Sequence, residues 1–149
     1  MIYKYTLSIA GDNFYPEKIV NKLQGDFIID SFFSPKDKKF NNSLDEYDYG
    51  GISFCHPKKS STEDKIIDYE SDFVDFIEKN YLFFIENNVK DFEIFIEIYY
   101  RGGQCNFEIF NKKKIQRFGR IGMSLPVSVY CLNSEYIKKW ESEIKSVWK

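Results

Sequence analysis

The sequence has few of the residues that usually carry chemistry in enzymes. It contains one histidine, His56, three cysteines and two methionines among its 149 residues. A serine or cysteine nucleophile needs a neighbouring base, most often histidine, so few candidate pairs exist. Neither a C-x-x-C nor an H-x-x-x-H pair, the spacings typical of zinc ligands, is present. The sequence therefore predicts no catalytic residue, no metal site and no cofactor, and it indicates a protein that is not an enzyme.

Long apolar runs and a strong net charge are also missing. No run reaches the length of about 18 apolar residues that a membrane-spanning helix needs, and the first residues lack the pattern of a signal peptide. The net charge of -2 gives no general attraction to nucleic acid or to an anionic membrane. Cys55, Cys105 and Cys131 lie far apart in apolar runs, which favours buried thiols over a disulfide framework. We therefore expect a cytoplasmic protein with no membrane partner.

Aromatic residues are abundant, and they make up 19% of the chain. Large rings of this number can build a substantial core. The hydrophobic periodicity predicts strands at 2–9, 27–33, 51–56, 91–110 and 126–132, and helices at 16–25, 61–88, 112–122 and 134–148. The segment 91–110 is a pair of strands, and Ser61 with Asp64 resembles the capping box of the long helix. We expect a single α+β domain, 1–149, with a mostly antiparallel sheet, a long central helix and a C-terminal amphipathic helix packed on it.

The segment 91–110, DFEIFIEIYYRGGQCNFEIF, reads as a hairpin whose tight turn is Gly102-Gly103. One face carries alternating apolar residues and is expected to face the core. On the other face, Glu97 would oppose Glu108, although like charges directly opposite each other destabilise a sheet. This mixture of rings and carboxylates suggests a partner-binding surface, whose members would be Glu93, Phe95, Glu97, Tyr99, Asn106, Glu108 and Phe110.

The same surface has two other interpretations. Carboxylates on adjacent strands can form an acid–base pair or hold a hard cation. Alternatively, the C-terminal helix could lie across the strands and place Lys138, Lys139 and Lys145 near the glutamates. The sequence leaves these alternatives open.

Two further segments are candidates for binding. Residues 34–51, SPKDKKFNNSLDEYDYGG, read as the one long loop, where a lid or a binding segment would lie, although a disordered or crossover connection would have the same composition. The basic run at 112–120 could contact phosphate groups. A solvated helix face fits that run better, because only Phe118 interleaves the charges.

Two stretches carry a resemblance to a known family. They are KYTLSIAGDNFYPEKIVNKL, near the start, and IQRFGRIGMSLPVSVYCL, near the end. Residues 3 to 132 resemble a small bacterial family catalogued as domain of unknown function 4279. Pro16-Glu17, the segment from Ile115 to Gly122, and Tyr130 match its helix start, its late short helix and the tyrosine that ends its last strand. The chain departs from the family pattern at GISFCH, where no tryptophan is present.

The resemblance implies an immunity-type protein, because members of that family accompany bacterial toxin systems. The leading hypothesis is that the chain binds and neutralises a cognate toxin domain of nuclease type, from a contact-dependent or polymorphic toxin system. The alternatives are a small-molecule or nucleic-acid binding module that uses residues 34–50 and 112–120, and an enzyme built on the carboxylates. A homo-oligomer that forms through an exposed strand edge is also an open possibility.

Overall fold

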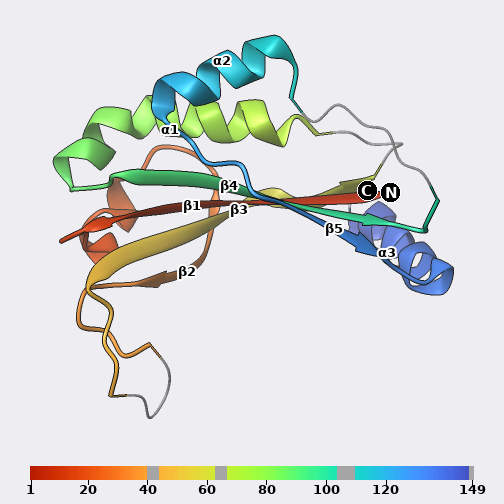
Figure 1. Cartoon of the computed structure of the whole chain (residues 1–149), viewed down its shortest axis with the longest axis horizontal. Coiled ribbons are helices and arrows are strands. Elements are labelled where there is room, and N and C mark those ends of the chain that lie inside the picture. Colours follow the sequence, from red (N-terminus) through yellow and green to blue (C-terminus); the bar gives the residue numbers. More distant parts are fainter. Residues whose placement is uncertain (40–43, 63–66, 104–109, 148–149) are drawn as a thin grey trace.

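The computed structural model describes residues 1–39, 44–62, 67–103 and 110–147. Its strands are β1 (Ile2–Asp12), β2 (Ile28–Phe33), β3 (Tyr49–Thr62), β4 (Asp91–Tyr100) and β5 (Val127–Cys131), and its helices are α1 (Tyr69–Glu86), α2 (Lys112–Ile121) and α3 (Ser134–Val147). The strands form one sheet in the order β2-β3-β1-β4-β5, in which only β4 and β5 are parallel (Figure 1). The fold is therefore α+β with a mostly antiparallel sheet, as the sequence predicts.

Helices α1 and α2 lie over one side of the sheet, which we call the first face (Figure 1). Along β4, burial alternates as the sequence predicts, and the buried side chains point to this face. Its core consists of strand residues and one stripe of α1, including Tyr5, Leu7, Ile9, Ile52, Phe54, Phe73, Ile77, Phe84, Ile94 and Ile96. The aromatic residues that the composition supplies are thus concentrated between α1 and the sheet.

Ion pairs hold α2 on α1. The Lys114 ammonium lies 2.6 Å from Asp68 and 3.0 Å from Glu70, and the Arg117 guanidinium contacts Asp75 and Glu78. The only buried side chain of α2 is that of Phe118. The contact between the two helices is therefore mainly electrostatic.

Asp68 makes part of this contact dependent on pH. Burial opposes its ionisation, but hydrogen bonds from the Lys114 ammonium and the Ser71 backbone N–H outweigh burial and lower its pKa to about 2. A carboxyl with a lowered pKa stabilises the fold above its unfolded pKa, and this contribution is lost as the pH falls through the folded value. We expect Asp68→Asn, which can still cap α1, to unfold more easily than the wild type near pH 5, and the difference to vanish near pH 2. Urea unfolding across this range measures it, and a difference that is independent of pH would contradict it.

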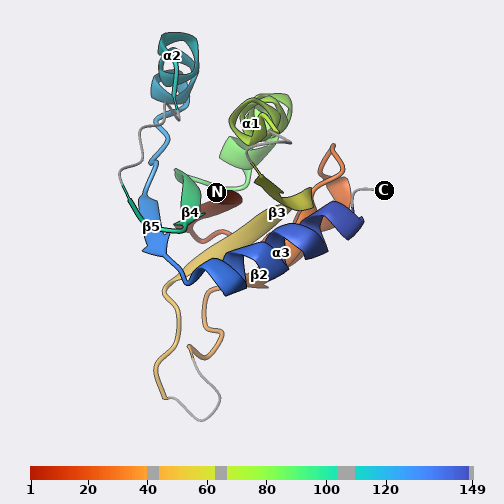
Figure 2. The ribbon, with the colours of Figure 1, turned by 90° about the vertical axis from the view of Figure 1, so that its right-hand side faces the viewer.

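Helix α3 lies against the opposite side of the sheet, the second face, and crosses only one end of it (Figure 2). Ile137 and Ile144 of α3 form a small cluster with Ile2 of β1, and Trp140 and Tyr99 pack against them. The expectation that the C-terminal helix packs on the sheet is confirmed. No described helix is long and apolar enough to span a membrane.

The predicted hairpin at 91–110 is wrong in its pairing. Strand β4 pairs with β1 on one side and with β5 on the other, and a bridge to Ser124 extends the second pairing to Glu93. Both sides are occupied, so β4 has no free side for a strand that returns after Gly102-Gly103. Residues 104–109, the body of the expected second strand, lie outside the described residues.

Two predicted helices also differ from the structure, one in its type and the other in its first residue. The segment after Pro16 forms two short 3-10 helices, Pro16–Lys18 and Val20–Lys22, instead of an α-helix. The Asn80 side chain bonds the backbone N–H and carbonyl of Gln24, which holds the end of this segment extended against α1. Ser61 is buried in β3 and is not the N-cap of α1, and Asp64 lies outside the described residues. Helix α1 begins later, where Asp68 accepts a hydrogen bond from the Ser71 N–H. Similarly, Asn133 provides the first cap contact of α3 in place of Ser134.

Candidate functional site

The predicted surface residues of β4 do lie on one face, but the structure pairs them with different partners. Glu97 faces Lys4 on β1 and Ser128 on β5. The Lys4 ammonium lies 2.8 Å from the Glu97 carboxylate, and the Tyr99 hydroxyl donates a hydrogen bond to the same group at 2.7 Å. Burial opposes ionisation, but these two hydrogen bonds outweigh it and lower the pKa of Glu97. Glu97 is thus paired with Lys4 and Tyr99. The sequence predicts Glu108 opposite it, and Glu108 lies outside the described residues.

Helix α3 covers part of the same surface. Trp140 packs on the Tyr99 ring, with the ring centres 4.8 Å apart, and Tyr130 stacks on Tyr99 at 4.9 Å. The cation that pairs with Glu97 in the described structure is Lys4 of β1. Lys138 and Lys139 are exposed, and the side chain of Lys145 is not described. The C-terminal helix therefore covers the end of β4 that carries Tyr99, which is one of the interpretations that the sequence left open.

The remaining residues of the predicted surface do not lie together on one face of the described structure. Phe110 packs edge to face on Phe118 of α2 and belongs to the first face, so the structure does not place it with the others. Asn106 and Glu108 lie outside the described residues. Glu93 and Phe95 stay on the second face beyond the cover of α3, and both are half-buried. The predicted surface therefore contributes two side chains to the open part of the second face.

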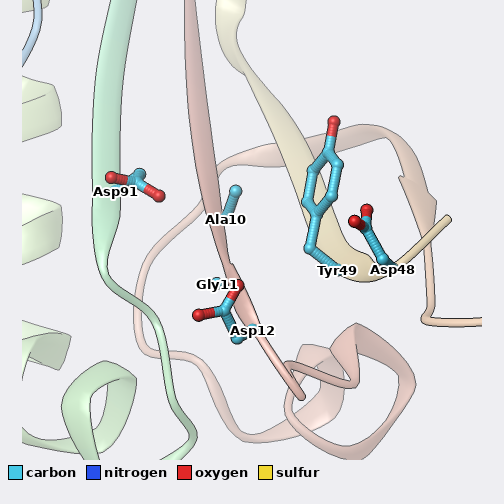
Figure 3. A pocket seen from close by; sticks show the side chains of 6 residues that line it. All are labelled: Ala10, Gly11, Asp12, Asp48, Tyr49 and Asp91. Atoms are coloured by element: carbon cyan, nitrogen blue, oxygen red, sulfur yellow. The ribbon is translucent and has the colours of Figure 1, made fainter.

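That open part contains a groove of about 260 Å³ at the end of the sheet remote from α3. Figure 3 shows its construction. Ala10 and Gly11 of β1 form the floor, Asp91 of β4 forms one wall, and Asp48 and Tyr49 at the start of β3 form the other. Asp12 lies at the end of the floor. Small residues on the central strand, between larger ones on its neighbours, create the hollow.

Aromatic side chains extend the wall on the β3 side. The Phe33 ring lies over Gly51, where an added Cβ would come within 2.7 Å of it. Tyr47 stacks on Phe33 with the ring centres 3.9 Å apart, and Tyr49 meets Phe33 edge to face at 5.2 Å. These contacts between neighbouring rings fix the shape of the wall, so it is pre-organised for binding.

Tyr47 and Asp48 belong to an arm, residues 34–39 and 44–48, that projects from the sheet (Figure 1). Lys36 and Tyr47 are joined by a backbone hydrogen bond of 2.8 Å, and Lys39 and Asp45 by one of 3.0 Å. The predicted long loop is therefore, in these residues, a narrow antiparallel connection. At its base, Asp48 lines the groove, and Tyr47 packs on Phe33 beside it.

The groove is acidic. Three carboxylates, those of Asp12, Asp48 and Asp91, line it, and one ammonium group, that of Lys90, lies 2.6 Å from Asp12. The hydrogen bond with Asp12 raises the pKa of Lys90. Among the described residues no ion pair is formed by Asp48 or Asp91, so two carboxylates can accept a cation from outside. No three side chains of the described part are placed to hold a metal ion.

Sequence reasoning did not predict this groove, because its residues come from three separate segments. A usable signal was the cluster of acids and tyrosines at 45–49, directly before the glycine pair Gly50-Gly51. No family model matches the chain, and comparisons with curated proteins and with solved structures also found no match.

Proposed function

We propose that this chain is an immunity-type protein that binds a cognate toxin domain through the groove and thereby neutralises it. The observation that supports the proposal is the combination of Asp48 and Asp91, which have no described ion-pair partner, with the pre-organised rings of Phe33, Tyr47 and Tyr49. Protein interfaces concentrate their binding energy in aromatic and arginine anchors that fill pockets. The groove is suited to receive a partner's arginine or lysine.

The charge of the groove supports a toxin of nuclease type. A nuclease cleft is basic because it binds phosphates, so an acidic groove attracts it and accelerates association. Within the basic run at 112–120, Lys114 and Arg117 are less suited to nucleic acid, since they are already paired with Glu70 and Glu78 of α1. This observation favours a protein partner over the nucleic-acid alternative.

The test is a binding measurement with the protein encoded immediately upstream of the gene for this chain, which the proposal expects to end in a toxin-like domain. We expect tight binding by the wild type, and we expect Asp48→Lys with Asp91→Lys to weaken it by about 100-fold, since each change replaces attraction by repulsion. Isothermal titration calorimetry gives the affinity, and a growth assay with the co-expressed toxin gives the neutralisation.

A matched control carries the same change of net charge elsewhere. Glu86 of α1 and Glu143 of α3 are exposed and lie outside the groove, so Glu86→Lys with Glu143→Lys should bind nearly as the wild type does. Equal losses in both variants would reduce the effect to net charge alone. Unchanged binding by the groove variant would refute the proposed surface.

A further inference from the structure

Among the described strands, β5 forms an edge of the sheet without the usual protection. It lies at the end of the strand order, and no described strand pairs with its outer side. Val127 is 43% exposed and Val129 52% exposed. No charged residue occurs between Arg120 and Glu135. Exposed edges normally carry charges, prolines or bulges, because bare edges pair with other chains.

The opposite edge, β2, is protected. Ile29 pairs with Phe54 and Ser31 with Ser53, so Asp30 is an extra residue that bulges from the ladder. A bulge twists an edge away from a potential partner, and the Asp30 carboxylate adds charge. The two edges of one sheet therefore differ, and only β5 presents an uncharged and regular ladder.

Backbone hydrogen bonds with β4 show in which direction the N–H and carbonyl groups of each β5 residue point. The Ile96 N–H donates to the Pro126 carbonyl, and the Leu132 N–H donates to the Tyr100 carbonyl. Even-numbered residues thus direct their backbone groups toward β4, and odd-numbered ones direct them outward. Pro126, which lacks an N–H, is therefore not an obstacle on the outer side. The outward residues are Val127, Val129 and Cys131.

We propose that the protein forms a two-fold symmetric dimer in which β5 pairs antiparallel with β5 of a second copy. The axis passes beside Val129, so that Val129 faces Val129 of the second copy and Val127 faces its Cys131. Every outward N–H and carbonyl of the three residues then has a partner. The two sheets become one continuous sheet, and the side chains of the valines and cysteines form one apolar stripe on its first face.

Three features select a second copy as the occupant. Because the outward residues are three, a two-fold axis beside the middle one, Val129, gives the backbone N–H and carbonyl of all three a hydrogen-bond partner. Because no charge occurs between Arg120 and Glu135, the paired β5 strands themselves bring no like charges together. Because β2 is protected, edge-to-edge growth stops at the dimer and does not continue into a filament. Figure 2 also shows that α3 leaves β5 toward β3 and β2, away from the outer edge.

The first experiment measures the mass of the purified chain by light scattering after size exclusion over a range of concentrations. We expect a dimer for the wild type, and a dissociation constant at least 100-fold higher for Val129→Lys. Two controls should remain dimeric: Val129→Thr, which is β-branched and uncharged, and Leu82→Lys, which places a lysine on the 76% exposed Leu82 of α1. A monomer at every concentration, or a dimer that survives Val129→Lys in the folded state, would overturn the proposal.

The second experiment tests the register through a disulfide. Opposed residues of a hydrogen-bonded antiparallel pair have Cα atoms about 5.5 Å apart, which is within the disulfide range. Val127→Cys should therefore crosslink to Cys131 of the second copy under mild oxidation. Residues four apart on one strand are about 13 Å apart, so the bond cannot form within a chain. Val127→Cys with Cys131→Ser should give no such crosslink, and neither should the wild type. Equal crosslinking of all three would overturn the register.

Discussion

Replacing Lys114 with methionine is expected to lower the free energy of unfolding by about 3 kcal/mol, because it leaves a buried carboxylate without its cation. The Glu70 side chain is 7% exposed and is held by the Lys114 ammonium at 3.0 Å and the Tyr5 hydroxyl at 2.6 Å. Burial, together with this carboxylate, raises the pKa of Tyr5. Methionine keeps most of the aliphatic stem, so the loss reports mainly the charge. Chemical denaturation at neutral pH measures it.

A double-mutant cycle separates the ion pair from packing. Glu70→Gln should cost less than Lys114→Met, and Glu70→Gln combined with Lys114→Met should recover part of the loss, because no unpaired charge remains buried. Lys113→Met is the control, since Lys113 is exposed on the same helix. If Lys114→Met and Lys113→Met lowered the free energy of unfolding by the same small amount, the ion pair with Glu70 would contribute little to the contact between α1 and α2.

The role of Lys114 illustrates what the sequence could not provide. Its partner Glu70 is 44 positions away, and a basic run at 112–120 looks the same whether it faces solvent, phosphate or a neighbouring helix. The sequence does predict α2 and its end at Gly122, because glycine readily adopts the left-handed conformation observed there. Local patterns thus locate helices, whereas the charges that join them depend on tertiary placement.

Strand pairing shows the same limit. Alternation in β4 identifies its buried face, because that period depends only on neighbouring residues. The choice of partner strand does not depend only on neighbouring residues. Gly102-Gly103 suggests a hairpin, but β4, α2 and β5 instead form a crossover unit, in which a helix connects two parallel strands. In the sequence, the predicted helix followed by the strand PVSVYCL indicates such a crossover. The glycine pair indicates a hairpin instead.

The groove lies at a different position from the surface that the sequence predicts. Rings among carboxylates were expected on the outer face of β4, and the groove has this composition around Asp91, Asp48 and Tyr49. The expected focus, Glu97, is instead bonded to Lys4 because β1 lies beside it. Only the order of strands in the sheet decides which carboxylates stay unpaired, and that order involves contacts between distant segments.

Replacing Gly50 with alanine should be among the most damaging single changes, with a loss of about 3 kcal/mol or more in the free energy of unfolding. An added Cβ would lie 1.8 Å from the Phe14 carbonyl oxygen and 2.8 Å from its carbon, and backbone cannot rotate away as a side chain can. Gly11, which pairs with Gly50, would place a Cβ 1.9 Å from the Asn88 carbonyl oxygen. Two opposed glycines thus let backbone from two loops lie directly on the sheet.

Gly119 offers a matched control for the same substitution. It lies inside α2, and an added Cβ would meet nothing within 4 Å in the described structure. Gly119→Ala should therefore raise the free energy of unfolding by about 0.5 to 1 kcal/mol, because alanine favours the helix. Thermal and urea unfolding of both variants give the comparison. A Gly50→Ala protein as stable as the wild type would mean that β3 and the segment at Phe14 can separate at no cost.

The Gly50→Ala change also connects stability to the groove. Asp48 and Tyr49 directly precede Gly50, so any movement of β3 that relieves the contact with Phe14 also displaces one wall of the groove. We therefore expect Gly50→Ala to reduce both stability and partner binding. Asp48→Lys with Asp91→Lys should reduce binding alone, because both side chains are exposed. If Gly50→Ala lost stability but bound the upstream-encoded domain with wild-type affinity, the groove would not be the contact surface, whatever its charge.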